Sequence, residues 1–429
     1  MRFNFLRWNT TTLTNPARAL AGTLICAALG VFFLCPQARG AEETHSLVCD
    51  LDALIEIPAV FGLTPGELES RYPTPEGFSK NPLFQWLTQT KDRAIFYRHP
   101  CADVLVDLTL LQGTLPVEEV IVDFVKGKLN GLTFSIYNRG DAGSISSEEF
   151  KRRLQACDKE LRKRLASMPS SHRADPASGR LSSGSTWFSP VGLGTLEMNP
   201  EAESGRTEYL KMRIAPRDAQ GAIAAAVRQH AGSTSLTQLK KNVQTEGSRT
   251  LIQGIPMVDQ GAKGYCVVAS AQRLFEYYGI SCDQHQLAKI ARSDAQEGTN
   301  SRQMVRALEC LGRNFHLQFK SLFARFTDGS LREPKNQKPA GLPEFQKMVE
   351  RYIGEGIPLL WGLELGRFPE QPALNRQIAD GHMRLIIGFD KDNLYFSDSW
   401  GAGHELGSMA VENAFAATNG LFVMHPTLR

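Results

Sequence analysis

The chain has 429 residues and a formal net charge of +3, a near balance that gives no indication of nucleic-acid binding. It contains no phosphate-binding P-loop, no dinucleotide-binding fingerprint, no His-Glu-x-x-His and no Gly-x-Ser-x-Gly. The sequence therefore argues against a nucleotide-dependent enzyme and against zinc proteases and serine hydrolases that carry those motifs. We predict no cofactor and no metal site.

Residues 1–40 are predicted to be a cleavable export signal. Arginines are the only charged residues before residues 19–37, an uncharged and largely apolar stretch that is typical of a signal-peptide core. Ala38-Arg39-Gly40 offers small residues at the spacing needed for cleavage before Ala41. A membrane anchor is the alternative, but the run is shorter than the roughly 20 residues that a spanning helix needs. We therefore expect a periplasmic or extracellular protein with no membrane segment after cleavage.

Residues 41–230 are predicted to form an α+β region whose function the sequence does not identify. Two segments carry Thr or Ser followed three residues later by Glu, which is typical of a helix start: Thr64-Pro65-Gly66-Glu67 and Ser146-Ser147-Glu148-Glu149. The second opens a basic helix to about Leu165, whose charged face is predicted to be solvated. The remaining expected elements are a short helix or turn at 84–87, strands at 94–97, 104–111, 117–125, 129–137, 186–198 and 207–214, a hairpin turn at 126–128 and a helix at 216–230.

Residues 231–250 are polar and are predicted to be a linker to a C-terminal domain, residues 251–429. This domain is organised around a helix that begins at Cys266. Apolar residues recur at helical spacing as far as Tyr278, and Gly279 follows where a helix C-cap is expected. Unpaired amides and the helix dipole at a helix N-terminus favour an anion such as a thiolate. For a lone cysteine, a small buried core residue is the alternative.

Two downstream strands are predicted to bring a base and a carboxylate to this cysteine. His382 begins an apolar run, Asp398 ends the next one, and Lys391-Asp392-Asn393 forms a turn between them. Adjacent antiparallel strands would place the two side chains close together. Gln260, six residues before Cys266, is placed to share an oxyanion site with the backbone N–H of Cys266. The four residues would supply a nucleophile, a base, an orienting group and an oxyanion donor.

This ordered set resembles the papain-fold cysteine peptidases, which carry a Gln-x5-Cys loop and helix, a His strand and an Asn/Asp-Ser-Trp-Gly stretch. Asp398-Ser399-Trp400-Gly401 matches the last stretch, with Asp in the orienting place. The pattern Gly381-His382-x5-Gly388-Phe389-Asp390 and this Asp are most similar to the bacterial branch that includes the double-glycine (bacteriocin-leader) peptidases. The resemblance covers about residues 251–426.

The resemblance implies an α+β fold: a papain-like domain with a helical wall and an antiparallel sheet, preceded by a smaller α+β domain. The expected helices are at 282–291 and 301–311, and the expected strands at 315–319, 358–365, 383–389, 394–396 and 421–424. The resemblance further implies a Cys266–His382–Asp398 triad with Gln260 as oxyanion donor. Residues implied to border the substrate groove are Gly264, Tyr265, Gly298, Thr299 and Gly381.

The remaining cysteines permit disulfides, because an exported chain meets an oxidising compartment. We favour a disulfide between Cys282 and Cys310, which lie in one domain, over one between Cys49 and Cys101, and Cys157 would then be left over. Connectivity does not follow from sequence, and six reduced thiols are the alternative.

Three functions are compatible with these residues. The first is an exported cysteine peptidase that acts on peptides or proteins. The second is an acyltransferase or isopeptidase that uses the same triad. The third is an inactive, peptidase-like binding protein, because Tyr265 and Val267 replace the family's usual neighbours of the cysteine. The N-terminal region could position the catalytic domain, bind substrate or act as an intramolecular inhibitor.

Overall fold

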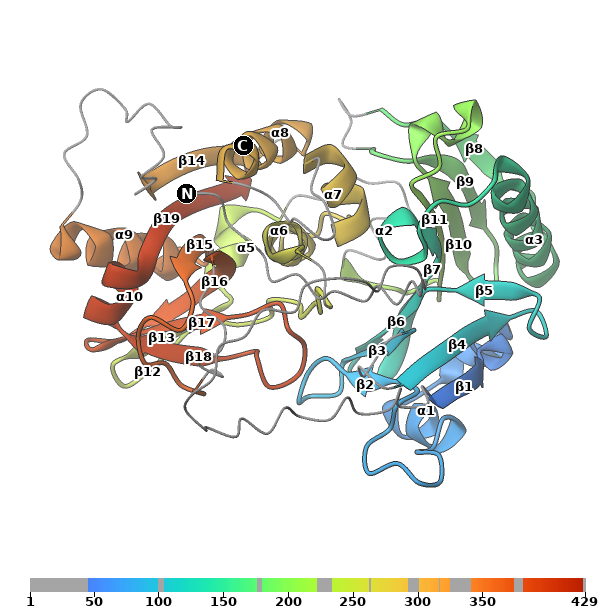
Figure 1. Ribbon diagram of the computed structural model, residues 1–429, viewed down its shortest axis with the longest axis horizontal. Helices are drawn as coiled ribbons and strands as arrows, with labels where there is room; N and C mark the ends of the chain where they lie inside the picture. The colour runs from blue at the N-terminus through green and yellow to red at the C-terminus, as the bar shows by residue number, and fades with distance from the viewer. Residues whose placement is uncertain are drawn as a thin grey trace, which may run out of the picture.

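The computed structural model describes residues 45–98, 104–175, 180–221, 234–261, 264–291, 301–315, 317–324, 341–373 and 381–426. The predicted leader, Cys101 and residues 222–230 of the predicted helix lie outside these ranges. Figure 1 shows two halves side by side, the N-terminal one in blue to green and the C-terminal one in yellow to red. Each half has its own sheet and its own apolar core. Among the described residues, no helix combines the length and apolarity needed to cross a membrane.

The N-terminal half is built on an eight-stranded sheet in the order β2-β3-β6-β7-β11-β10-β9-β8, in which neighbouring strands are antiparallel. Its central hairpin turns at Lys126 and Gly127, within the segment where the sequence predicts a hairpin turn. Both residues have positive φ. The strands are β2 (Gln85–Trp86), β3 (Arg93–Tyr97), β6 (Glu119–Val125), β7 (Lys128–Asn138), β8 (Ser170–His172), β9 (Ser183–Phe188), β10 (Leu193–Met198) and β11 (Tyr209–Ala215).

A second, three-stranded sheet in this half has the order β1-β4-β5. The capping box at Thr64 is formed, and Ser146 caps the predicted basic helix α3, which packs against β9 and β10. The segment predicted as a short helix or turn at 84–87 instead contributes β2, because its backbone pairs with β3. The other elements are β1 (His45–Asp50), β4 (Val104–Leu110), β5 (Leu115–Val117), η1 (Asp52–Ile55), η2 (Ala59–Gly62), η4 (Pro200–Ser204), α1 (Pro65–Arg71), α2 (Arg139–Ala142) and α3 (Ser147–Leu165).

The C-terminal half has a sheet in the order β12-β13-β16-β15-β19-β14, and β17 and β18 extend it from β16. Helix α6 packs against β16 and against α7, and α8 packs against α7 and β14. The strands are β12 (Val243–Glu246), β13 (Arg249–Ile252), β14 (Leu317–Ala324), β15 (Leu359–Glu364), β16 (Gly381–Phe389), β17 (Asn393–Ser397), β18 (Gly407–Ala410) and β19 (Thr418–Pro426). The helices are α5 (Leu236–Lys240), α6 (Cys266–Tyr277), α7 (Gln284–Ala291), α8 (Ser301–Asn314), α9 (Leu342–Gly354) and α10 (Val411–Ala417).

Two predictions about the organisation of the chain differ from what the structure shows. Residues 234–250 of the predicted linker form α5, β12 and the start of β13, and Leu239 is fully buried in the C-terminal core. Their polarity reflects the exposed edge of the sheet, since β12 is mostly solvent-exposed and pairs only with β13 along the described strands. The smaller size predicted for the preceding domain is not confirmed, because its main sheet has as many strands as the C-terminal sheet.

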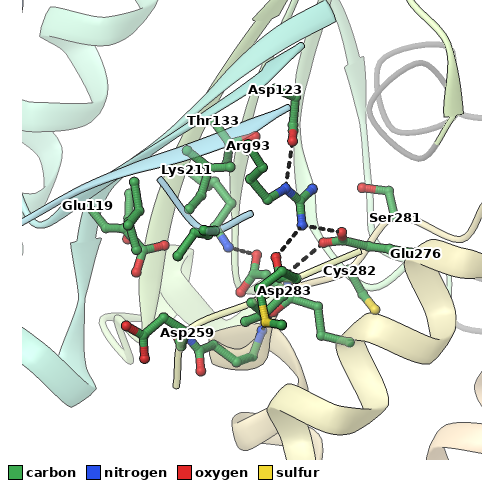
Figure 2. A pocket seen from close by; sticks show the side chains of 18 of the residues that line it. Arg93, Glu119, Asp123, Thr133, Lys211, Asp259, Glu276, Ser281, Cys282 and Asp283 are labelled. Carbon is green, nitrogen blue, oxygen red and sulfur yellow. Dashed lines mark hydrogen bonds and ion pairs between the residues drawn. The ribbon is translucent and has the colours of Figure 1, made fainter. Parts of the chain in front are cut away.

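Polar contacts join the two halves around a cavity of about 60 Å³ (Figure 2). Arg93 of β3 donates hydrogen bonds to Asp123 of β6 at 2.6 Å, to Glu276 of α6 at 2.8 Å and to the Met257 carbonyl at 3.0 Å. The interface is therefore anchored on the same helix that begins at Cys266.

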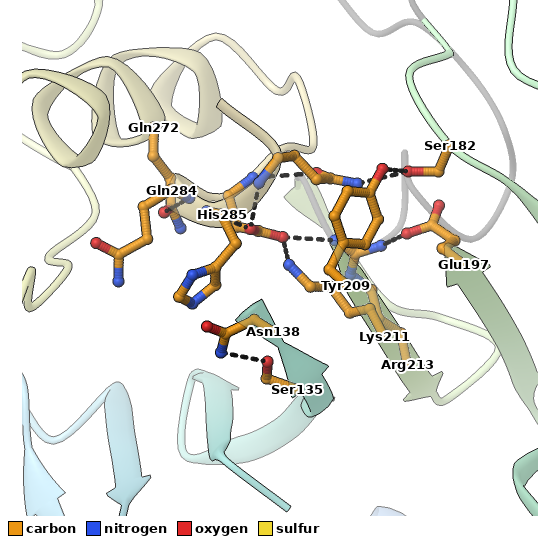
Figure 3. A network of polar contacts seen from close by, with 12 residues as sticks. Ser135, Asn138, Ser182, Glu197, Tyr209, Lys211, Arg213, Gln272, Gln284 and His285 are labelled. Atoms are coloured by element: carbon orange, nitrogen blue, oxygen red, sulfur yellow. Dashed lines mark hydrogen bonds and ion pairs between the residues drawn. The ribbon is translucent and has the colours of Figure 1, made fainter. Parts of the chain in front are cut away.

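A second part of this interface lies between β11 and the start of α7 (Figure 3). Lys211 forms an ion pair with Asp283, and the side-chain amide of Gln286 donates to the Ser182 hydroxyl at 2.7 Å. Ser182 is also hydrogen-bonded to the Tyr209 hydroxyl at 2.8 Å. The contacts of Asp283 and Gln286 tie the helices of the C-terminal half to the N-terminal sheet.

Candidate active site

Cys266 is the first residue of α6, as the sequence predicts. The helix ends at Tyr277, and Gly279 follows with φ of +75°, a conformation that glycine adopts without strain. Every residue from Cys266 to Phe275 is buried, so the helix is held by packing on all sides. Tyr265 provides no side-chain cap for the first turn. The amides and the dipole at the N-terminus of a helix favour a negative charge at this position.

His382 and Asp398 meet because β16 and β17 are antiparallel neighbours, which pair Leu385 with Ser397. His382 is the second residue of β16, and Asp398 directly follows β17. The His382 Nε2 atom lies 2.6 Å from Asp398 Oδ1, and the Ser399 N–H donates to the same oxygen at 2.8 Å. Asp398 is 1% exposed and His382 8% exposed. The carboxylate thus has a fixed direction toward the imidazole.

The charges at this contact stabilise the ionised form of both partners. Burial raises the pKa of the Asp398 carboxyl, but the charges of His382 and Arg384 and their hydrogen bonds outweigh burial and hold it well below its usual range. Burial lowers the pKa of His382, but the Asp398 carboxylate and a side-chain hydrogen bond with Cys266 raise it to about 9. Since Nε2 faces Asp398, Nδ1 is the ring nitrogen left for Cys266. Near neutral pH, this environment favours an imidazolium.

Arg384 and Glu370 extend this charged cluster and were not predicted from the sequence. Arg384 donates to Asp398 Oδ2 at 2.6 Å and makes a two-pronged contact with the Glu370 carboxylate at 2.8 and 3.0 Å. The sequence does carry a signal for Arg384. It is a charged residue inside an apolar strand, two positions after His382 and therefore on the same face of the sheet. Glu370 lies in a loop, and its pairing has no such periodic signal.

Gln260 is held next to the loop that contains Asp398. Its backbone N–H donates to the Ser399 carbonyl at 2.8 Å, and the neighbouring Asp259 forms an isolated bridge with Trp400. The Trp400 ring stacks on His382, with ring centroids 4.6 Å apart and planes at 25°. These contacts connect the loop before Cys266, the carboxylate loop and the imidazole.

The residues predicted to border a groove have different surroundings. Gly381 begins β16 next to His382, and Gly264 lies in the half-buried approach to Cys266. Tyr265 is buried and contacts the N-terminal half, where a Cβ at Gly140 of α2 would lie 2.8 Å from its hydroxyl oxygen. Tyr265 therefore packs at the interface between the two halves. Gly298 and Thr299 lie outside the described residues.

The predicted disulfide between Cys282 and Cys310 is not formed. Cys282 lies just before α7 and lines the cavity against the N-terminal half, whereas Cys310 belongs to α8. Their place in one domain does not bring the two sulfurs together. Cys49 and Cys157 are buried thiols in the N-terminal core. Among the described residues, no three His, Cys, Asp or Glu side chains gather in a geometry that could hold a metal ion.

Comparisons with known proteins bear on the C-terminal half. Residues 252–421 match a family model described as Peptidase_C39 like family. A solved structure of a C39-like peptidase from Bacillus anthracis is similar at 12% identity and a TM-score of 0.31, over 42% of this chain and 99% of the other. The peptidase domain of Streptococcus ComA, a bi-functional ABC transporter involved in a quorum sensing pathway, is similar at 16% identity and a TM-score of 0.25, over 40% and 97%. No curated protein matches the chain. On the family match, residues 252–421 resemble the C39-like peptidases.

Proposed function

We propose that this chain is an exported cysteine peptidase that hydrolyses peptide bonds with Cys266 as nucleophile. One observation carries the proposal: the His382 imidazole contacts the Asp398 carboxylate at 2.6 Å and interacts with Cys266 at the α6 N-terminus. A nucleophile, a base and an orienting carboxylate in this order are the parts required for covalent acyl transfer. Export is proposed from the leader-like residues 1–40 alone.

The proposed reaction begins with proton transfer from the Cys266 thiol to Nδ1 of His382. The thiolate attacks the peptide carbonyl, and the oxyanion receives hydrogen bonds from the Cys266 amide and the Gln260 side chain. The C–N bond breaks as His382 returns its proton to the leaving amine. Water, deprotonated by His382, then releases the acyl group from Cys266. Asp398 keeps Nε2–H directed at itself and stabilises the imidazolium in each half of the cycle.

The test is the rate at which iodoacetamide alkylates Cys266 near neutral pH, with the modified cysteines mapped by mass spectrometry. This reagent is small, which suits a thiol that is 6% exposed. In the wild-type protein, Cys266 should react faster than half-buried Cys310, and His382→Ala should slow it by about 100-fold, because the base is lost. His425→Ala is the matched control, since His425 lies on β19 and hydrogen-bonds to the Pro426 carbonyl.

A folded wild-type protein whose Cys266 reacts no faster than Cys310, or is indifferent to His382→Ala, would sink the catalytic proposal and favour an inactive binding protein. If Cys266 is activated, digestion of a peptide library with and without an added primary amine gives the reaction type. Free carboxylate products support hydrolysis, and amide products with the added amine support acyl transfer.

A further inference from the structure

Arg384 is an enclosed cation at the candidate active site, with 1% of its surface exposed. Its guanidinium contacts two carboxylates, Asp398 through Nε and Glu370 through both terminal nitrogens. The aromatic rings of Phe396 and Trp400 flank it, with centroids 4.4 and 5.8 Å from its central carbon. A buried arginine loses its hydration, so this arrangement persists only because both carboxylates and the rings replace water.

Asp398 has polar contacts on both of its carboxylate oxygens, with His382, the Ser399 N–H and Arg384. Oδ1 faces His382 and the Ser399 N–H, and Oδ2 accepts from Arg384. A carboxylate held through both oxygens cannot rotate away from the imidazole without breaking charge-assisted bonds. The two-pronged contact with Glu370 in turn prevents the guanidinium from swinging with Asp398.

Glu370 provides Arg384 with a second carboxylate. Without Glu370, Asp398 alone would balance the positive charge of Arg384. The order of charges is Glu370 negative, Arg384 positive, Asp398 negative and His382 positive. Arg273 of α6 is a further cation near Asp398, and it hydrogen-bonds to the Ser397 hydroxyl and the Pro256 carbonyl. With Glu370 present, Asp398 keeps enough negative charge to support the imidazolium.

We propose that Arg384 and Glu370 are a positioning pair that fixes the Asp398 carboxylate against Nε2 of His382. This role rests on the proposed function, because it matters only if the Cys266–His382 pair is reactive. Neither residue touches the reacting atoms, so both act through Asp398. This positioning role explains why Arg384 and Glu370 form a buried ion pair next to the candidate triad, where an apolar pair of the same size would be no less stable.

The test measures the rate of Cys266 alkylation by iodoacetamide from mildly acidic to alkaline pH, in the full chain. Arg384→Met should slow alkylation at neutral pH by about tenfold or more, since an imidazole without its fixed carboxylate pairs poorly with the thiolate. The alkaline inflection, where His382 loses its proton, should shift away from its wild-type position by about one pH unit, because both the direction of the Asp398 carboxylate and the nearby charge change. Arg384→Lys retains the charge and one donor toward Asp398, and should restore most of the wild-type position of the inflection on the pH axis.

Arg153→Met is the matched control for the loss of a buried arginine. Arg153 is also buried and bonded to a carboxylate, Glu149, but it lies on α3 in the N-terminal half. The Arg153→Met substitution should lower the stability of the protein without moving the alkaline inflection of Cys266 alkylation. If Arg384→Met does not fold, Glu370→Gln is the deciding variant, with an expected slowing of about two- to fivefold, because Arg384 then lacks its neutralising partner.

The role is overturned if folded Arg384→Met, or Glu370→Gln in its place, has the wild-type rate and inflection while His382→Ala remains slow; the proposed function then stands. It is also overturned if Arg153→Met changes the profile as much as Arg384→Met, which would indicate general destabilisation. If wild-type Cys266 is itself unreactive, the proposed function fails and this role fails with it.

Discussion

The proton on His382 should make the folded chain lose stability as the pH rises above neutrality. The pKa of His382 is raised from 6.5 to about 9, against burial, by the Asp398 carboxylate and Cys266. A group whose folded pKa is raised stabilises the protein fully below its unfolded pKa and loses that contribution as the pH rises through the folded value. At about 1.4 kcal/mol per pH unit, the contribution lost between pH 6.5 and about 9 is roughly 3 kcal/mol.

The measurement is the free energy of urea unfolding between about pH 6 and about pH 9.5, in wild type and in His382→Gln. Only the difference between the two proteins reports His382. Buried thiols also lose stabilisation above pH 8.5, because burial raises the pKa of Cys49 and Cys157 to about 12 and raises the pKa of Cys282 well above its usual value. These thiols are present in both proteins, so their contributions cancel in the difference.

We expect wild type to exceed His382→Gln by about 3 kcal/mol more at pH 6 than at pH 9.5. Asp398→Asn should remove most of this pH-dependent difference, because the charge that holds the proton is gone. A difference that stays constant within about 1 kcal/mol across the range would refute the reasoning. It would mean that His382 is neutral at physiological pH and that the imidazolium required by the proposed reaction is not stabilised by this site.

Two further predictions concern the interface between the halves. Arg93→Met leaves the Asp123 and Glu276 carboxylates without the cation that joins them, and should cost about 3 kcal/mol of unfolding free energy; a loss below about 1 kcal/mol would show that water replaces the guanidinium. Gly140→Ala would place a Cβ 2.8 Å from the Tyr265 hydroxyl oxygen and should cost about 1–3 kcal/mol through overpacking. Tyr265→Phe removes that oxygen, so the double variant should recover most of the loss in the same urea titration, and additive losses would argue against this contact.

The sequence was sufficient for the parts of the candidate site that depend on local patterns. Cys266 is predicted at a helix start by apolar spacing and by Gly279. His382 and Asp398 are predicted to be neighbours because two apolar runs flank a short turn, which leaves an antiparallel pair as the simplest arrangement. The capping box at Thr64 is equally local, since all its hydrogen bonds lie within four residues.

What the sequence could not provide depends on contacts between distant segments. Glu370 and Arg384 are 14 residues apart and meet through the fold of a loop, with no periodic signal. Cys282 and Cys310 share a domain but belong to different surroundings, so their place in one domain predicted a disulfide that is not formed. The polar stretch before residue 251 was predicted to be a linker because an exposed edge hairpin and a linker have the same composition.

Helix α6 connects the N-terminal half to the candidate nucleophile at both of its ends. Tyr265, directly before Cys266, packs beside Gly140, and Glu276 near the other end bonds to Arg93. Ten residues of α-helix span about 15 Å, so Arg93 is too far from Cys266 to act on it directly. If Arg93→Met nevertheless changes the Cys266 alkylation rate as Gly140→Ala does, α6 moves as a rigid body and the N-terminal half sets the position of the thiol. If only Gly140→Ala does so, the dependence is local to Tyr265, and the Arg93 contacts contribute stability alone.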